Sequence, residues 1–238
     1  MRHLTKHFER SYVINLPSRR DRQRQMEREL TRWGVGFASG KIEIFPAIRP
    51  EAPGDFPSLG ARGCFMSHLE ILRHALSRGP SSVLIMEDDL AIDTQLAGVE
   101  EALVHTLSSV PWSLVYLGHT AVNLPRSNDV VVRADADTMC SHFYGVSAQG
   151  LPALVEYLEK VLTRPAGHPD GGPMHYDGAL TMFRAQNPHR TLFASPSMGS
   201  QRSSRSDIAR LKWFDQFPLV RGAVSHARRL RESVSARV

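Results

Sequence analysis

The most constraining feature of this sequence is a short apolar run, Val83 to Met86, which leads directly into three carboxylates. Apolar side chains on both faces are typical of a central strand in a parallel sheet, because helices cover such a strand on both sides. The run is far shorter than the roughly 20 apolar residues that a membrane span requires. The sequence therefore predicts an α/β protein with this strand inside a mostly parallel sheet.

The start of the chain predicts a strand, a helix and a second strand in succession. Residues 11–16 are rich in β-branched and aromatic side chains, residues 19–33 carry apolar side chains at helical spacing, and residues 41–45 alternate. Strand, helix and strand in one short segment form the βαβ unit of a parallel sheet. The same patterns predict helices at 64–76, 96–107 and 151–162, and strands at 114–117, 130–132, 143–146 and 191–194.

Composition supports one folded domain without disulfides. The chain has 238 residues, of which 42% are apolar, and this is enough to build a core. Its two cysteines, Cys64 and Cys140, are too few for a disulfide framework and lack the Cys-x-x-Cys spacing of a structural zinc site. The first residues lack the apolar core of a signal peptide, so we expect a cytoplasmic protein.

Positive charge is concentrated at the end of the chain. Residues 202–238 contain nine Lys and Arg against three Asp and Glu, a net +6, whereas residues 1–201 carry a net −1. This distribution argues against a nucleic-acid-binding surface and for a local contact with something anionic. We expect a basic extension that could place the protein at the inner face of an anionic membrane.

Glu87, Asp88 and Asp89 form the sharpest candidate site. Three adjacent carboxylates repel one another unless a cation neutralises them, and ligands bind at strand ends in open α/β sheets. Oxygen ligands favour Mg²⁺ or Mn²⁺ over zinc, so all three are candidate metal ligands. The alternative is a solvated acidic turn in which Asp89 or Asp93 caps the following helix.

The remaining candidate site residues indicate a functional site only when they are considered together. Ser67 and His68 lie on the apolar face of a predicted helix, where a lone histidine is more often a core residue than a catalyst. Asn15 and Arg19 follow the first strand, but charges there also suit a first helical turn. Asp177 follows a Gly- and Pro-rich loop, where it could project into a site or simply cap a helix.

Three motifs occur in this order along the chain: Tyr12–Leu16 with Arg19 and Asp21-Arg22, Gly60–Cys64 with Ser67-His68, and Leu84–Asp89. Taken together, these segments resemble glycosyltransferase family 25, which contains bacterial lipooligosaccharide and collagen β-galactosyltransferases. The later stretches GVSAQG, YDGAL and SPSMGSQRSSRSDI are also similar, so the resemblance covers about residues 11–208. Ala61 departs from the pattern, since the family often has an acidic residue there.

The resemblance implies a single GT-A-type, Rossmann-like domain over residues 1–208, followed by a basic extension over 209–238. It implies a UDP-sugar donor, with galactose the expected sugar, and inverting transfer to a hydroxyl of a glycan, a glycolipid or a small molecule. Mn²⁺ or Mg²⁺ would be held by an acidic motif of the DxD kind.

The resemblance also suggests roles for individual residues. Asp89 is expected to act in catalysis as a metal ligand, with Glu87, Asp88 and His175 as further ligands. Inversion needs a base for the acceptor hydroxyl, for which Asp177 is the candidate. The residues expected to contact the donor or its metal are Asn15, Arg19, Arg22, Ser67, His68, Glu87 and Asp88.

Two other functional classes remain open at this stage. A sugar nucleotidyltransferase would use a similar sheet and carboxylates, but it usually has a Gly-rich loop after the first strand, and Leu16-Pro17-Ser18 lacks glycine. A non-catalytic nucleotide-sugar-binding domain would have a decayed site, whereas the acidic triplet is intact.

Overall fold

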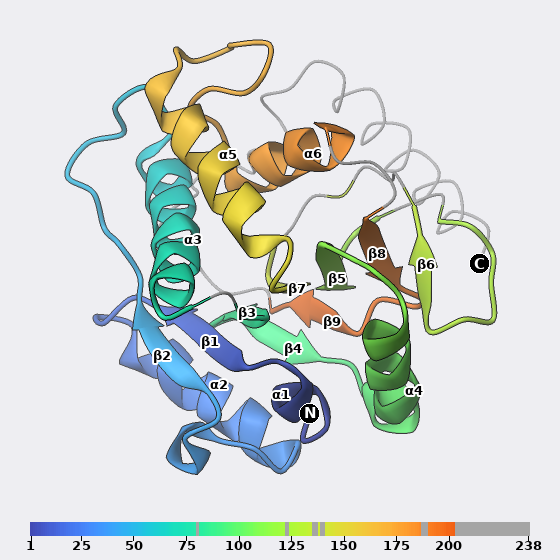
Figure 1. Cartoon of the computed structure of the whole chain (residues 1–238). Helices are drawn as coiled ribbons and strands as arrows, with labels where there is room; N and C mark the ends of the chain where they lie inside the picture. Colours follow the sequence, from blue (N-terminus) through green and yellow to red (C-terminus); the bar gives the residue numbers. More distant parts are fainter. Residues whose placement is uncertain (80, 122–123, 135–137, 139–140, 187–189, 203–238) are drawn as a thin grey trace, which may run out of the picture. The chain divides into compact units, whose positions relative to one another are not determined.

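Figure 1 shows a computed structural model that describes residues 1–79, 81–121, 124–134, 138, 141–186 and 190–202. These residues belong to one compact unit. The basic extension predicted for residues 209–238 lies outside them. The helices are α1 (Leu4–His7), α2 (Arg20–Arg32), the 3₁₀ helix η1 (Phe37–Ser39), α3 (Leu59–Ser77), α4 (Leu96–Ser109), α5 (Leu151–Thr163) and α6 (Tyr176–Gln186). The strands are β1 (Arg10–Asn15), β2 (Glu43–Pro46), β3 (Val83–Glu87), β4 (Leu90–Ile92), β5 (Leu114–Gly118), β6 (Val131–Arg133), β7 (Phe143–Val146), β8 (Thr191–Ala194) and β9 (Gly199–Gln201).

The main sheet has seven strands in the order β2-β1-β3-β7-β5-β8-β6. The strand β1 runs parallel to β2 and β3, and β5 runs parallel to β8. The strand β7 is antiparallel to both β3 and β5, and β6 is antiparallel to β8. The α/β fold and the βαβ unit are confirmed, while the sheet as a whole is mixed. Because β7 is buried along its whole length, its apolar pattern matches that of a parallel strand and did not reveal its direction.

Helices cover both faces of this sheet, as Figure 1 shows. On one face α3, α5 and α6 bury apolar side chains against one set of strand residues, and on the other face α1, α2 and α4 do the same. Side chains of β3 alternate between the layers: Val83 and Ile85 face the first, and Leu84 and Met86 face the second. The strand is therefore central, as its sequence predicts. None of the helices in the described part of the chain combines the length and apolarity that a bilayer crossing requires.

A second, two-stranded sheet was not predicted from the sequence. The strand β4 follows the acidic triplet directly and pairs antiparallel with β9, so that Leu90 lies opposite Gln201. The sequence of β9, Gly-Ser-Gln, has neither apolar alternation nor β-branched residues, so nothing in its pattern indicates a strand. The pairing brings residue 201 back to the end of β3.

Gly145 tests how tightly the sheet packs against α1 and its flanking segment. A Cβ atom at Gly145 would lie 2.4 Å from the Phe8 ring and 3.0 Å from Val115, whereas one at the exposed Gly98 in α4 would meet nothing within 4 Å. We expect Gly145→Ala to lower the free energy of unfolding by about 1–3 kcal/mol through overpacking. Gly98→Ala should raise it by up to about 1 kcal/mol, because alanine favours helix. Urea unfolding of both variants measures this, and equal stabilities would contradict the packing described.

Candidate functional site

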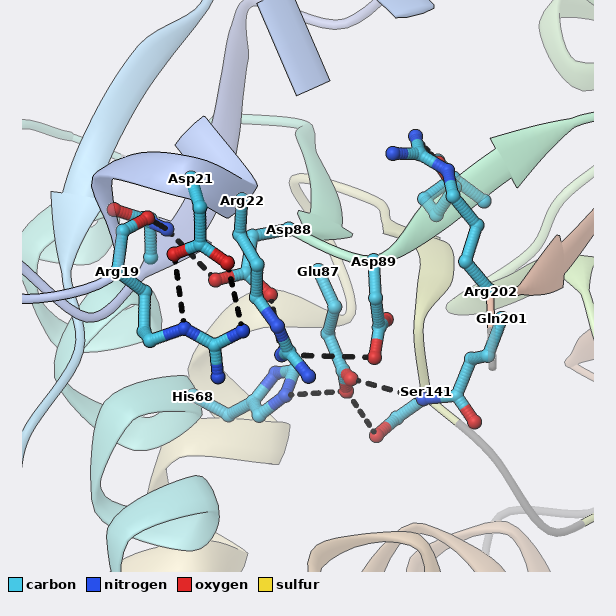
Figure 2. Close-up of polar contacts among 12 residues, drawn as sticks. Arg19, Asp21, Arg22, His68, Glu87, Asp88, Asp89, Ser141, Gln201 and Arg202 are labelled. Atoms are coloured by element: carbon cyan, nitrogen blue, oxygen red, sulfur yellow. Dashed lines mark hydrogen bonds and ion pairs between the residues drawn. The ribbon is translucent and has the colours of Figure 1, made fainter. Parts of the chain in front are cut away.

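The acidic triplet lies where three strands of the main sheet meet. Ile14, near the end of β1, is in register with Glu87 at the end of β3. The backbone N–H of Glu87 donates to the carbonyl of His142, just before β7, at 2.9 Å. Figure 2 shows the three carboxylates between α2, α3 and β9. The site therefore forms at the carboxyl edge of the parallel strands, as expected for an open α/β sheet.

Strand alternation directs Glu87 toward α3. One oxygen of Glu87 lies 3.4 Å from Nε2 of His68, and the Ser141 hydroxyl donates to the same oxygen at 3.5 Å. The other oxygen accepts a 3.1 Å hydrogen bond from the Gln201 amide on β9. Burial alone would raise the pKa of Glu87, but hydrogen bonds from His68 and Gln201, together with the electrostatic effects of His68 and His142, outweigh it and lower that pKa. Glu87 is thus held as a carboxylate.

Asp88 points the other way, toward α2. Its two oxygens accept hydrogen bonds from the Asn15 amide at 2.7 Å and from the Arg22 guanidinium at 2.8 Å. Burial raises the pKa of Asp88, and Arg22 and Asn15 offset part of this shift. Asp88 therefore ties the end of β3 to the end of β1 and to the first turns of α2.

Asp89 is the least satisfied of the three. Its Oδ1 is buried and has no hydrogen-bond partner among the described residues, and its Oδ2 lies 3.7 Å from Arg22. Burial, followed by the negative charge of Glu87, raises the pKa of Asp89 to about 7. The backbone of Asp89 is anchored, since its carbonyl accepts a 2.8 Å hydrogen bond from the Arg202 N–H. Asp89 does not cap the next helix, because β4 follows it, whereas Asp93 accepts a 2.9 Å hydrogen bond from the Gln95 N–H just before α4.

His68 occupies a buried aromatic stack beneath Glu87. Its Nδ1 lies 3.0 Å from the Tyr144 hydroxyl, which lies 2.8 Å from the Tyr176 hydroxyl. The Tyr176 ring stacks on the imidazole with centroids 4.1 Å apart. His68 is only 1% exposed, so the expectation of a satisfied core histidine is met, but its Nε2 also faces the site. The hydrogen bond at Nδ1 fixes the ring orientation.

The Ser67 hydroxyl makes hydrogen bonds that stabilise the local backbone. Its hydroxyl donates to the Gly63 carbonyl at 2.6 Å and accepts from the Ile48 N–H at 2.8 Å. A Cβ atom at Gly63 would lie 2.9 Å from the Ile48 carbonyl, so glycine is needed where this loop meets α3. These two motif residues therefore attach the loop after β2 to α3.

Three further predicted site residues lie on the neighbouring elements. Arg19 precedes α2 and forms a 2.9 Å ion pair with Asp21. His175 immediately precedes α6, and Asp177 lies in the first turn of that helix, both half-buried. The predicted roles of His175 as a metal ligand and of Asp177 as the base stay predictions.

The thiol of Cys64, on α3, is subject to the charges of carboxylates from both α6 and the acidic triplet. Burial raises the pKa of its thiol well above the usual value, and the charges of Glu87, Asp177 and Asp89 raise it further. The charges of all three carboxylates therefore act on the half-buried Cys64 thiol. Sequence reasoning did not place Cys64 in the site, although it precedes His68 by one helical turn and therefore shares its face of α3.

Other site residues could not be found from the sequence. Ser141 and Gln201 reach Glu87 from segments distant along the chain. No local pattern marks Ser141, whereas Gln201 lies in the stretch SPSMGSQRSSRSDI that resembles the family, where polar residues are expected. Tyr144 reaches His68 from β7, and Tyr176 reaches it from α6, which packs against α3. Long-range pairing, rather than spacing, brings these groups together.

Comparison with known proteins agrees with this architecture. Residues 8–135 match the description Glycosyltransferase family 25 (LPS biosynthesis protein), and the chain belongs to this family. A glycosyltransferase involved in the glycosylation of the major capsid of PBCV-1 has a similar fold, with a TM-score of 0.50 and 11% identity. The match covers 82% of this chain and 93% of the viral one.

Curated relatives include proteins with different described activities. Procollagen galactosyltransferase 1 of Danio rerio is 26% identical over 180 residues, covering 65% of this chain and 30% of its own length. Inactive glycosyltransferase 25 family member 3 of Homo sapiens is 28% identical over 141 residues, covering 52% and 24% respectively. The chain thus spans about a quarter to a third of these relatives, and its own activity has to be argued from the site.

The raised pKa of Asp89 predicts how stability depends on pH in metal-free protein. Because the pKa is about 7 in the folded chain against 3.8 as the usual value, ionisation of Asp89 favours the unfolded chain. Wild type should lose stability, by a few kcal/mol at most, as the pH rises from about 4 to about 7. Asp89→Asn should remove this loss. Urea unfolding of both proteins in EDTA measures it, and parallel pH profiles would contradict the burial of an ionisable Asp89.

Proposed function

We propose that this chain is a metal-dependent inverting glycosyltransferase that moves a hexose, with galactose the expected sugar, from a UDP-sugar to an acceptor hydroxyl. Family membership supports the reaction class, and the procollagen galactosyltransferase relatives support the sugar. The observation that carries the proposal is the buried Oδ1 of Asp89, which has no partner among the described residues and lies beside the charged Glu87. A divalent cation would satisfy this oxygen and offset the repulsion.

The residues present fit Mn²⁺ or Mg²⁺. Glu87 and Asp89 are carboxylates two residues apart, and the negative charge of Glu87 helps to raise the pKa of Asp89. Oxygen ligands of this kind suit hard divalent cations, which usually bind through one or two carboxylates together with substrate phosphates. The bound ion would stabilise the negative charge that develops on the departing diphosphate.

We assign a different task to Asp88, which the sequence suggested as a third ligand. Both of its oxygens are engaged by Asn15 and Arg22, so binding an ion would mean giving up these bonds. Asp88 is better suited to position Arg22, whose guanidinium also approaches Asp89 at 3.7 Å. From there Arg22 can reach the donor's phosphates, with Arg19 beside it on the same turn.

Inverting transfer also needs a base that removes the proton of the acceptor hydroxyl, on the side of the donor sugar opposite the departing diphosphate. Asp177 is the proposed base, because α6 packs against α3 beside the acidic triplet and the charge of Asp177 reaches Cys64. His175, just before α6, is the second choice for this base or, alternatively, a further ligand of the metal ion. The acceptor is expected to be a glycan, a glycolipid or a small molecule, and the basic residues 202–238 would favour an anionic acceptor or membrane surface.

A non-catalytic nucleotide-sugar-binding domain is the second candidate. It is favoured by the relatives described as inactive, such as the human protein. Thermal unfolding with UDP, UDP-galactose, UDP-glucose and GDP-mannose, each with and without Mn²⁺, tests binding for both candidates. A Mn²⁺-dependent rise in melting temperature with UDP compounds is expected. Transfer or hydrolysis of the same donor then separates enzyme from binding domain, and no response to any nucleotide would contradict both.

Asp88 and Asp89 offer a matched pair of variants. Asp89→Asn should lower transfer by about a hundredfold or more, because it removes a proposed ligand of the ion. Asp88→Asn should weaken UDP binding by about tenfold while Mn²⁺ dependence persists, because it releases Arg22. Initial rates and UDP titrations at several Mn²⁺ concentrations measure both effects. Identical behaviour of the two variants would contradict the division of tasks.

Asp177→Asn tests the proposed base. We expect turnover to fall by roughly 10² to 10⁴, the range typical of a missing general base, with UDP binding nearly unchanged. Asp170→Asn is the control, since Asp170 is an exposed residue of the loop before α6. A collapse of UDP affinity in Asp177→Asn would instead make this residue a donor or metal ligand.

A further inference from the structure

Three potential metal ligands converge beside the acidic site, and they share only Glu87 with the proposed Mn²⁺ pair. The Cys64 sulfur, a ring nitrogen of His68 and a carboxylate oxygen of Glu87 all lie within 4.8 Å of one another. Cys64 and His68 are one helical turn apart on α3, and Glu87 comes from β3. Spacing along the sequence did not indicate such a site, because the third ligand belongs to another element.

We propose that Cys64, His68 and Glu87 form a binding site for a thiophilic divalent cation of the zinc class. Thiolate and imidazole select zinc over Mg²⁺ and Mn²⁺, and three protein ligands leave a fourth position for water. Tetrahedral zinc would hold these ligand atoms about 3.4–3.6 Å apart. The His68 Nε2 to Glu87 Oε1 distance is already 3.4 Å.

The surroundings of His68 support this assignment independently. A ligating histidine usually uses its second nitrogen for a hydrogen bond that orients the ring. In His68 the Tyr144 hydroxyl occupies Nδ1 at 3.0 Å and is itself bonded to Tyr176 at 2.8 Å, which leaves Nε2 directed at Glu87. The nearby carboxylates of Asp89 and Asp177 add negative charge that favours a cation.

Sharing Glu87 gives the site a regulatory consequence, which rests on the proposed function. A zinc ion that holds Glu87 against α3 competes with the Mn²⁺ that needs the same carboxylate. Zinc should therefore inhibit transfer in wild type, and at least about tenfold more zinc should be needed in Cys64→Ser, which lacks the thiolate.

Cobalt titration of the full chain tests the site without any activity assay. Co²⁺ bound to a thiolate gives a near-ultraviolet charge-transfer band, which zinc should then bleach. We expect the band in wild type and in Cys140→Ser, which alters the other cysteine of the chain, and its loss in Cys64→Ser. Absence of the band from wild type, or its persistence in Cys64→Ser, would overturn the proposal.

A second variant covers the case in which Cys64→Ser does not fold. Tyr144→Phe keeps all three ligands but removes the hydroxyl that orients His68, and should weaken Co²⁺ binding by about 10–100-fold. Unchanged affinity would overturn the proposal. Thermal shifts with UDP and Mn²⁺ on the same samples separate the two hypotheses. A cobalt band without nucleotide binding supports the zinc site while removing the glycosyltransferase proposal, and nucleotide binding without the band overturns the zinc site alone.

Discussion

Mutual repulsion among three consecutive carboxylates is the constraint on which the rest of this site depends. Side-chain alternation at the end of β3 points two of these carboxylates in opposite directions, because Glu87 faces α3 and Asp88 faces α2. Hydrogen bonds stabilise the negative charge of both, with Arg22 paired to Asp88, whereas Asp89 keeps a buried oxygen without a partner among the described residues. The pKa of Asp89 is raised as a result, and a divalent cation bound there together with a donor diphosphate would offset the repulsion.

The fold delivers the compensating groups from distant parts of the chain. Parallel pairing of β1 with β3 sets Asn15 and the start of α2 beside Asp88, and pairing of β4 with β9 returns Gln201 to Glu87. Packing of α6 on α3 places Tyr176 over His68. This arrangement is consistent with membership of glycosyltransferase family 25 and gives separate tasks to residues that are adjacent in the sequence.

Much of this architecture was predictable, and the exceptions have physical reasons. Apolar spacing in α2 and the double-sided apolar pattern of β3 located those elements, and the strand-end position of Glu87 to Asp89 predicted a candidate site at this edge of the sheet. The direction of β7 was not predictable, because a strand buried on both faces has the same composition in either direction. The contacts of Gln201, Tyr144 and Cys64 depend on long-range packing, and the polar β9 carries no strand pattern.

Diffraction from crystals grown with UDP and Mn²⁺, collected at the manganese absorption edge, tests the central claim most directly. The account predicts an anomalous peak within bonding distance of Glu87 and of the buried Oδ1 of Asp89, with Arg22 still paired to Asp88. A structure with UDP bound but no ion at these carboxylates, or with the ion on Asp88 and Arg22 displaced, would contradict it.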